Sequence, residues 1–228
     1  MIKILAINLN HRTRPKPILP AMIDVISELD PEIVVFTEYV DQGEATKLKV
    51  MLGAVGLEHQ AVSESDEYRP GRWHNQILIA SRKPIEFSAV PSSGPDVMSR
   101  TNTLMAKTYG IHISGIRVPA YEQLADWYPY WEWLNDALEG DLAIGDFNAD
   151  PGRAKKKDRV IDALVAHGGW VRPDIEGEWS YRGSNGTQSR VDHVLVKDPV
   201  RVVSARYIAE PFVPVITDHA GLLVEIIS

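Results

Sequence analysis

Short apolar runs recur along the chain and alternate with helical patterns, and this alternation restricts the fold more than any other feature. Residues 2–9 and 33–37 are apolar at nearly every position and rich in β-branched side chains, as buried strands are. Between them, residues 20–29 carry apolar side chains close to helical spacing, beginning at Pro20 and ending at Asp30-Pro31. A strand, a helix and a second strand in this short span predict a layered α/β fold.

The same reasoning extends to the rest of the chain. We expect further helices over residues 43–55, 121–138 and 160–166. We expect further strands over residues 76–81, 84–90, 103–118, 142–145, 179–182, 190–197, 201–208 and 222–227. The strands expected over residues 84–90 and 103–118 alternate between apolar and polar positions, as antiparallel strands do. Two sheets packed together with helices outside would account for so many apolar strands. Because no repeat or linker interrupts the pattern, we predict one domain over residues 1–228.

The composition excludes several kinds of site. Cysteine is absent from the 228 residues, which rules out disulfides, thiolate metal ligands and a cysteine nucleophile. The net charge of −7 fits a site for a divalent cation and, taken alone, argues against a surface coated for nucleic acid. No apolar run approaches the roughly 20 residues of a membrane span, and the N-terminus lacks the features of a secretory signal. We therefore predict a cytoplasmic protein.

Polar residues that can perform chemistry repeatedly end these apolar strands or lie within them. They are Asn8, Asn10, Glu38, Asp146, Asn148, Asp192, Asp218 and His219. Because strand ends are where a rigid scaffold presents site residues, we expect these side chains to meet. The carboxylates of Glu38 and Asp218, with amides such as Asn8 and Asn10, offer the hard oxygen ligands that Mg²⁺ prefers.

The other residues in this set suggest acid–base chemistry on a phosphate. Asp146 and Asn148 face the same way on an extended chain, so one could accept a proton from water while the other orients that water. His219 could stabilise negative charge growing on a phosphoryl oxygen, with Asp192 holding its ring in one tautomer. The combination predicts metal-assisted attack of water on phosphorus.

Each of these residues also has a purely structural interpretation. Asp146 could begin an Asx-turn, Asn148 could stabilise residues 146–150 as a loop, and His219 could be a core histidine with satisfied hydrogen bonds. Asp192 needs a partner if it is buried, and Arg190 or His193 could supply it instead of His219.

Five segments, in order, resemble the endonuclease/exonuclease/phosphatase superfamily, which includes exonuclease III and deoxyribonuclease I. They are Asn8-Leu9-Asn10, Thr37-Glu38, Gly145-Asp146-Phe147-Asn148, Ser189-Arg190-Val191-Asp192-His193 and Thr217-Asp218-His219. The resemblance implies a four-layered α/β/β/α sandwich of two mixed sheets, with the site at one end of both sheets. It also implies Mg²⁺ or Mn²⁺ on Glu38 with Asn8 and Asp218 nearby, and catalytic roles for Asp146, Asn148, Asp192 and His219.

Two positions depart from the pattern that the resemblance implies. Arg117 stands where the superfamily usually has His or Tyr, and Ala120 stands where its abasic-site endonucleases have Asn. Arg117 could contact a phosphate or form a structural salt bridge, and His112 takes the missing role if the alignment is shifted. Further candidates for substrate contact are Asn75, Arg190 and Trp179.

An aromatic segment follows these positions. Trp127, Trp131 and Leu134 recur at helical spacing, which favours a buried helix face. Alternatively, Pro129 begins the helix and leaves Trp127 or Tyr130 at the rim of the site.

Basic residues gather in the loops next to the predicted catalytic strand ends. They are Arg12, Arg14, Lys16, Arg69, Arg72, Arg153, Lys155, Lys156, Lys157, Arg159, Arg182 and Arg190. We therefore expect a cationic rim around an acidic metal site, suited to a polyanion. The sequence predicts a monomeric, metal-dependent phosphodiester hydrolase acting on nucleic acid, with DNA favoured over RNA. The alternatives are a phosphatase or phosphodiesterase for a small phosphorylated molecule or phospholipid headgroup, and a catalytically weakened binding module.

Overall fold

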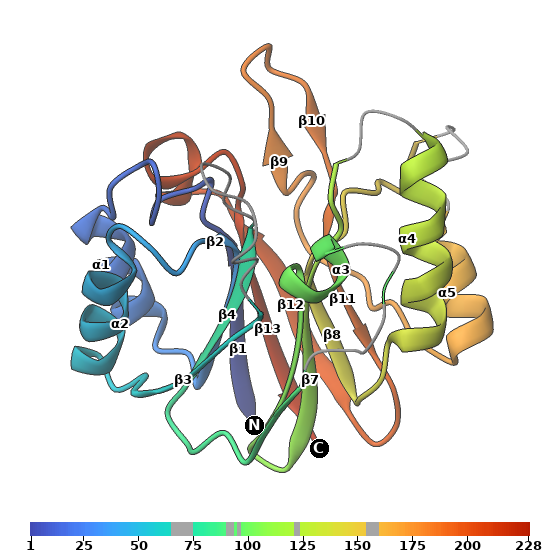
Figure 1. Cartoon of the computed structure of the whole chain (residues 1–228), viewed down its shortest axis with the longest axis horizontal. Coiled ribbons are helices and arrows are strands. Elements are labelled where there is room, and N and C mark those ends of the chain that lie inside the picture. The colour runs from blue at the N-terminus through green and yellow to red at the C-terminus, as the bar shows by residue number, and fades with distance from the viewer. Residues whose placement is uncertain (65–74, 90–93, 95–96, 121–123, 154–159) are drawn as a thin grey trace.

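Two sheets stack face to face in the computed structural model, and helices cover the outer face of each (Figure 1). The structure describes residues 1–64, 75–89, 94, 97–120, 124–153 and 160–228. Within these residues, the first sheet has the order β12-β13-β1-β2-β4-β3 and the second has the order β11-β8-β7-β6-β5. The four layers are those that the sequence predicts.

The first sheet and its helices contain both chain ends. Its strands are β1 (Ile2–Asn8), β2 (Ile33–Tyr39), β3 (His59–Val62), β4 (Gln76–Ser81), β12 (Arg201–Ile208) and β13 (Gly221–Ile227). Helices α1 (Pro20–Leu29) and α2 (Ala45–Ala54) cover its outer face, beside a π-helical turn, η2 (Phe212–Ile216). Strands β1 and β2 run parallel, whereas β13 runs antiparallel to β1.

The second sheet carries the other half of the sandwich. Its strands are β5 (Phe87–Ala89), β6 (Thr103–Thr108), β7 (Ile111–Arg117), β8 (Leu142–Asp146) and β11 (Asp192–Val196). Helices α4 (Leu124–Ala137) and α5 (Val160–Gly168) cover its outer face, and a short helix, α3 (Val97–Thr101), precedes β6. A small hairpin, β9 (Tyr181–Arg182) with β10 (Gln188–Ser189), projects beyond the end of the sandwich that lies opposite the chain termini (Figure 1).

The apolar runs have no polar face because both faces of their strands are buried. In β1, Ile4 packs into the core between the two sheets, whereas Leu5 packs into the core under the α1 and α2 helices. Val35 and Phe36 of β2 divide in the same way. A strand buried on both faces reads as a continuous apolar run, which is what the sequence contains.

Several predicted elements differ in detail. The predicted strand 103–118 is a hairpin of β6 and β7, which turns at Tyr109 and Gly110, both with positive φ. Strands β7 and β8 pair in parallel, whereas β6 pairs antiparallel with both β5 and β7. Strand β3, helix α3 and the η2 turn were not predicted, because they are short and, in β3, only half-buried.

The structure of α4 excludes one of the two interpretations of the aromatic segment. Pro129 lies inside α4 and does not begin it, and Tyr130 is completely buried, so Tyr130 is not at the rim of the site. Trp131 and Leu134 are buried in the core under this helix, as their spacing predicts. The side chain of Trp127 lies outside the described part of the structure. Among the described residues, no helix is both long enough and apolar enough to cross a membrane.

Candidate active site

Strand register brings the predicted polar residues to one end of the sandwich. In the parallel pair β1 and β2, Asn8 lies opposite Thr37, so Glu38 follows directly beside it. In the second sheet, Asp146 at the end of β8 lies between Arg117 of β7 and Asp192 of β11. A cavity of about 370 Å³ opens here, and six of the predicted residues line it. They are Glu38, Arg117, Asp146, Asn148, Asp218 and His219.

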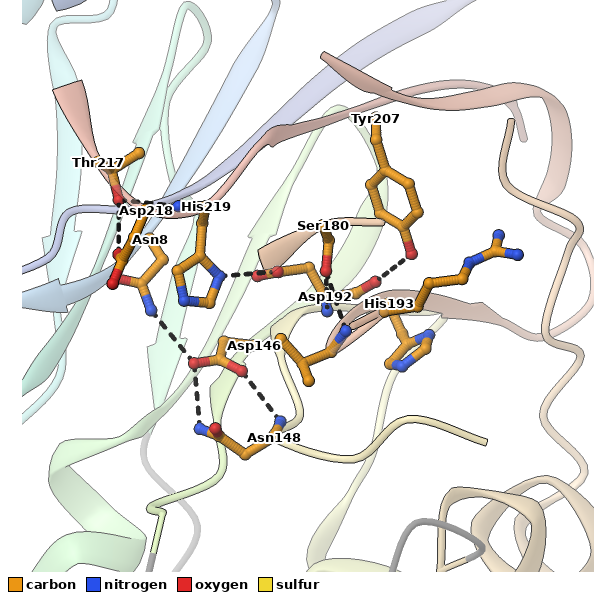
Figure 2. A network of polar contacts seen from close by, with 12 residues as sticks. Asn8, Asp146, Asn148, Ser180, Asp192, His193, Tyr207, Thr217, Asp218 and His219 are labelled. Atoms are coloured by element: carbon orange, nitrogen blue, oxygen red, sulfur yellow. Dashed lines mark hydrogen bonds and ion pairs between the residues drawn. The ribbon is translucent and has the colours of Figure 1, made fainter. Parts of the chain in front are cut away.

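Asp146 lies at the base of this cavity and accepts three hydrogen bonds (Figure 2). The Asn8 amide donates to its Oδ2 at 3.1 Å, and Asn148 donates from its backbone N–H at 2.9 Å and its side-chain amide at 3.1 Å. Burial, reinforced by the Asp192 carboxylate, raises the pKa of Asp146 to about 7. A carboxylate with this pKa can accept a proton near neutral pH.

The local backbone at Asp146 explains the Gly-Asp-Phe-Asn sequence. Gly145 has φ +143°, and a Cβ atom there would lie 2.1 Å from the Ile116 carbonyl oxygen, so only glycine fits. Phe147 is fully buried against Trp131, with ring centroids 6.2 Å apart. Asn148 adopts φ +50°, and its backbone N–H closes an Asx-turn on Asp146. The structural interpretation of Asp146 as the start of an Asx-turn is therefore correct, and Asp146 and Asn148 also line the cavity.

His219 and Asp192 form a buried pair in which His219 Nδ1 lies 2.8 Å from Asp192 Oδ2 (Figure 2). Burial alone would lower the pKa of His219, but the Asp192 carboxylate outweighs it and raises the pKa to about 9. The imidazole is therefore protonated at neutral pH. The Ser180 hydroxyl oxygen accepts the backbone N–H groups of Val191 and Asp192 at 2.9 and 3.0 Å, which fixes this strand end.

The other proposed partners of Asp192 are engaged elsewhere. Arg190 donates to the carbonyl oxygen of Ile175 at 2.6 Å and lies over the Tyr207 ring. His193 Nε2 contacts the carbonyl oxygen of Ala149 at 2.9 Å. Arg190 is held by these contacts and does not line the cavity that contains Asp146, so its predicted substrate contact has no support in this cavity.

Glu38 lines the same cavity as Asp146 and has a lowered pKa. Burial would raise the pKa of Glu38, but the Arg117 guanidinium and His11 hold it below its usual value, so the carboxylate is ionised. Arg117 donates to Glu38 Oε1 from Nε at 3.1 Å and from Nη2 at 2.9 Å. Nearby, the Asn10 side-chain amide donates to Asp218 Oδ1 at 2.8 Å, and Lys16 contacts the Asn10 side-chain oxygen.

These residues suit a hard divalent cation by their chemistry. Glu38 and Asp218 line the cavity, and the side-chain oxygen of Asn8 lies at the end of the neighbouring strand. Within the part of the chain that the structure describes, no three acidic or histidine side chains form a metal cluster. Mg²⁺ commonly binds proteins through one or two carboxylates and keeps several waters, so a smaller donor set is compatible with it.

Other predicted contacts lie outside this cavity. His112 is exposed near the start of β7, at the opposite end of the strand from Arg117. Asn75 and Trp179 are half-buried and do not line the cavity.

The predicted basic rim is only partly described. Arg153 lines the cavity, whereas Arg12 donates to the carbonyl oxygens of Val215 and Ile216. Arg69, Arg72, Lys155, Lys156, Lys157 and Arg159 lie outside the described residues.

Three cavity residues were not predicted as site residues, namely His11, Asp150 and Tyr181. His11 adopts φ +62° in the loop after β1 and faces Glu38. The Tyr181 ring lies 5.0 Å from the His219 ring, centroid to centroid. His11 directly follows the Asn8-Leu9-Asn10 segment and Tyr181 lies in a predicted strand, but none of the three belongs to a periodic pattern that would single it out. Notably, Asn10, His11, Glu38 and Asn148 all have positive φ, a conformation that non-glycine residues rarely adopt.

Comparisons with known proteins identify the family and similar folds. A family model described as "Endonuclease/Exonuclease/phosphatase family" matches residues 6–219. A search of curated proteins finds no match. An AP endonuclease from Archaeoglobus fulgidus has a similar structure, with a TM-score of 0.76 and 18% identity over 99% of each chain.

Two structures from Neisseria are also similar. A 3′-5′ exonuclease from Neisseria meningitidis, NExo, has a TM-score of 0.75 and 16% identity over 98% of this chain and 99% of that chain. A 3′ phosphatase NExo from Neisseria, bound to product DNA hairpin, has a TM-score of 0.73 and 16% identity over 100% of both chains. By the family model, which covers nearly all of its length, the chain belongs to the endonuclease/exonuclease/phosphatase family of phosphoester hydrolases.

Proposed function

We propose that this chain is a divalent-metal-dependent phosphodiesterase that hydrolyses DNA. The proposal rests mainly on two ionisable groups that line one cavity. They are Asp146, with a pKa of about 7, and His219, with a pKa of about 9. Between these values the first group is a base and the second is a cation. Hydrolysis of a phosphodiester needs both roles.

Each residue has a role that follows from its contacts. Asp146 removes a proton from the attacking water, and Asn148 keeps the Asp146 carboxylate aimed into the cavity while helping to orient that water. The imidazolium of His219, held by Asp192, stabilises the negative charge that builds on the phosphoryl oxygens. Glu38 and Asp218, with the Asn8 amide, would hold Mg²⁺ or Mn²⁺, whose charge would polarise the phosphate and stabilise the leaving oxygen.

The preference for DNA rests on charge and on the structural neighbours. Arg117 and Arg153 bring positive charge to the cavity of a chain whose net charge is −7. These guanidinium groups are paired with Glu38 and Asp150, and a phosphate backbone that binds to them should bind less tightly as salt rises. An AP endonuclease and NExo have structures similar to this one, and one NExo structure contains a product DNA hairpin.

A second candidate is hydrolysis of a terminal phosphomonoester. The Asp146 and His219 chemistry acts on phosphorus and does not depend on what lies beyond it, and one of the similar structures is a 3′ phosphatase. This candidate takes the same catalytic residues and differs only in the leaving group.

The deciding experiment compares four substrates with Mg²⁺ or Mn²⁺ and with chelator. These are supercoiled plasmid, a duplex with one abasic site, an oligonucleotide with a 3′-phosphate, and a panel of small phosphomonoesters and phospholipids. Asp146→Asn and His219→Ala serve as inactive controls that test whether activity belongs to this site. We expect metal-dependent cleavage of a DNA substrate that both substitutions abolish. Turnover confined to small phosphomonoesters or lipids, or cleavage that persists in both variants, would overturn the proposal.

A further inference from the structure

Both carboxylate oxygens of Glu38 already face nitrogen atoms of neighbouring side chains. Oε1 accepts two hydrogen bonds from Arg117, and Oε2 lies 3.4 Å from His11 Nε2. The side chains of Glu38 and Arg117 are only 14% and 13% exposed. A cation that approaches Glu38 must therefore enter space that Arg117 and His11 border.

A divalent cation and the Arg117 guanidinium cannot both be well stabilised on this one carboxylate. The two carboxylates assigned to the cation, Glu38 and Asp218, supply two negative charges, whereas the cation and the guanidinium together carry three positive charges. The low exposure of the ion pair weakens solvent screening, so repulsion between the cation and the guanidinium is strong at contact distance. Asp192 cannot relieve it, because its carboxylate is paired with His219.

Arg117 has a second set of contacts that would keep it in the cavity after it leaves Glu38. Its Nη1 lies 3.4 Å from Asn102 Oδ1, and its backbone N–H donates to the Asn102 carbonyl oxygen at 2.9 Å. Its own carbonyl oxygen is 3.4 Å from the Tyr130 hydroxyl. A displaced guanidinium would remain anchored beside Asp146, where a substrate phosphate is its natural partner.

His11 is held less firmly than Arg117. Its contact with Glu38 is longer, and among the described residues nothing forms a hydrogen bond with its buried Nδ1 atom. Its ring can therefore turn away from Glu38 without breaking a second hydrogen bond. The barrier to cation entry lies mainly in the two hydrogen bonds from Arg117.

We propose that Arg117 and a divalent cation compete for Glu38, so that Arg117 occupies the metal position until the cation displaces the guanidinium toward the substrate phosphate. The inference rests on the proposed metal dependence and deepens it. Arg117 then acts as a positioning residue that links metal binding to phosphate binding, a role that a His or Tyr side chain at this position would not fill.

Calorimetric titration with Mn²⁺, without substrate, tests the competition directly. We expect Arg117→Gln to bind Mn²⁺ roughly tenfold more tightly than the wild type, because charge-assisted hydrogen bonds no longer oppose binding. Arg153→Gln is the matched control: it removes the same charge from the same cavity, but Arg153 pairs with Asp150, 3.3 Å away. The control should gain no more than about threefold, the effect of net charge alone. Glu38→Gln should lose the site.

A second measurement observes the Arg117 side chain in the wild-type protein itself. The Nε–H resonance of Arg117, assigned by its absence from the Arg117→Gln spectrum, should shift as Mg²⁺ is added to the wild type. It should not shift in Glu38→Gln.

The possible results separate the two proposals. Equal Mn²⁺ affinity in the wild type and Arg117→Gln, or equal gains in Arg117→Gln and Arg153→Gln, would overturn the competition and leave the proposed function intact. Absence of Mn²⁺ binding in every one of these proteins would overturn the proposed metal dependence and the competition with it.

Discussion

The Nδ1 atom of His219 lies 2.8 Å from Oδ2 of Asp192, and less than a tenth of either side chain is exposed. This buried pair fixes the protonation of His219, which the proposed chemistry uses, and also links the stability of the fold to pH.

The first prediction concerns that link. Because the pKa of His219 is raised to about 9, its stabilising effect should be complete below the unfolded value of about 6.5 and should disappear as pH rises through 9. We expect the stability difference between the wild type and His219→Gln to shrink by about 3 kcal/mol between about pH 6 and pH 10. Urea denaturation of both proteins measures it. A difference that does not change with pH would show that the pair is not ionic.

The second prediction is a bell-shaped pH dependence of kcat/KM. Activity should rise through about pH 7 as Asp146 loses its proton and fall through about pH 9 as His219 loses its own. Asp192→Asn should move the falling limb to lower pH, because it removes the carboxylate that raises the pKa of His219. The profiles should be measured at saturating metal for both proteins. If the falling limb stays at the same pH in Asp192→Asn, then deprotonation of His219 does not cause it.

Gly145 provides a third prediction, on stability. Gly145→Ala should destabilise the fold by more than about 2 kcal/mol, because its Cβ would lie 2.1 Å from the Ile116 carbonyl oxygen. Gly110→Ala is the matched control, since Gly110 also has positive φ (+77°) but its Cβ would meet nothing within 4 Å. The control should cost only about 1 kcal/mol. Equal losses in thermal or chemical denaturation would mean that backbone strain, and not the close approach, decides the effect.

The fourth prediction tests the support under Asp192. Ser180→Ala leaves the backbone N–H groups of Val191 and Asp192 buried without their acceptor, at a cost of about 2 kcal/mol or more. Because Asp192 orients His219, kcat should fall as well. Ser204→Ala removes an exposed hydroxyl that donates to Glu225, and neither residue lines the cavity, so it should change neither quantity measurably. Unchanged kcat in a folded Ser180→Ala protein would show that Ser180 does not position Asp192 for catalysis.

The sequence was sufficient for the layers and for most of the cavity residues. Both follow from one local signal, an apolar strand that is flanked by polar side chains. Parallel pairing brings together the ends of β1 and β2 and of β7 and β8, and antiparallel pairing adds the starts of β11 and β13 at the same edge. The sequence offered a structural salt bridge for Arg117, and the structure contains one, but Glu38 could not be predicted as the partner because the two residues belong to different sheets and no local pattern relates them. The same holds for His11, whose position depends on a left-handed loop conformation.

Asn10, His11, Glu38 and Asn148 all hold a backbone conformation that costs side-chain-bearing residues of order 1 kcal/mol or more each. Replacing any of them with glycine would relieve that strain, but at Glu38 and Asn148 it would also remove the side-chain contacts with Arg117 and Asp146. Selection for activity should therefore keep glycine out of these positions, and the fold carries their backbone strain as a standing cost to its melting temperature.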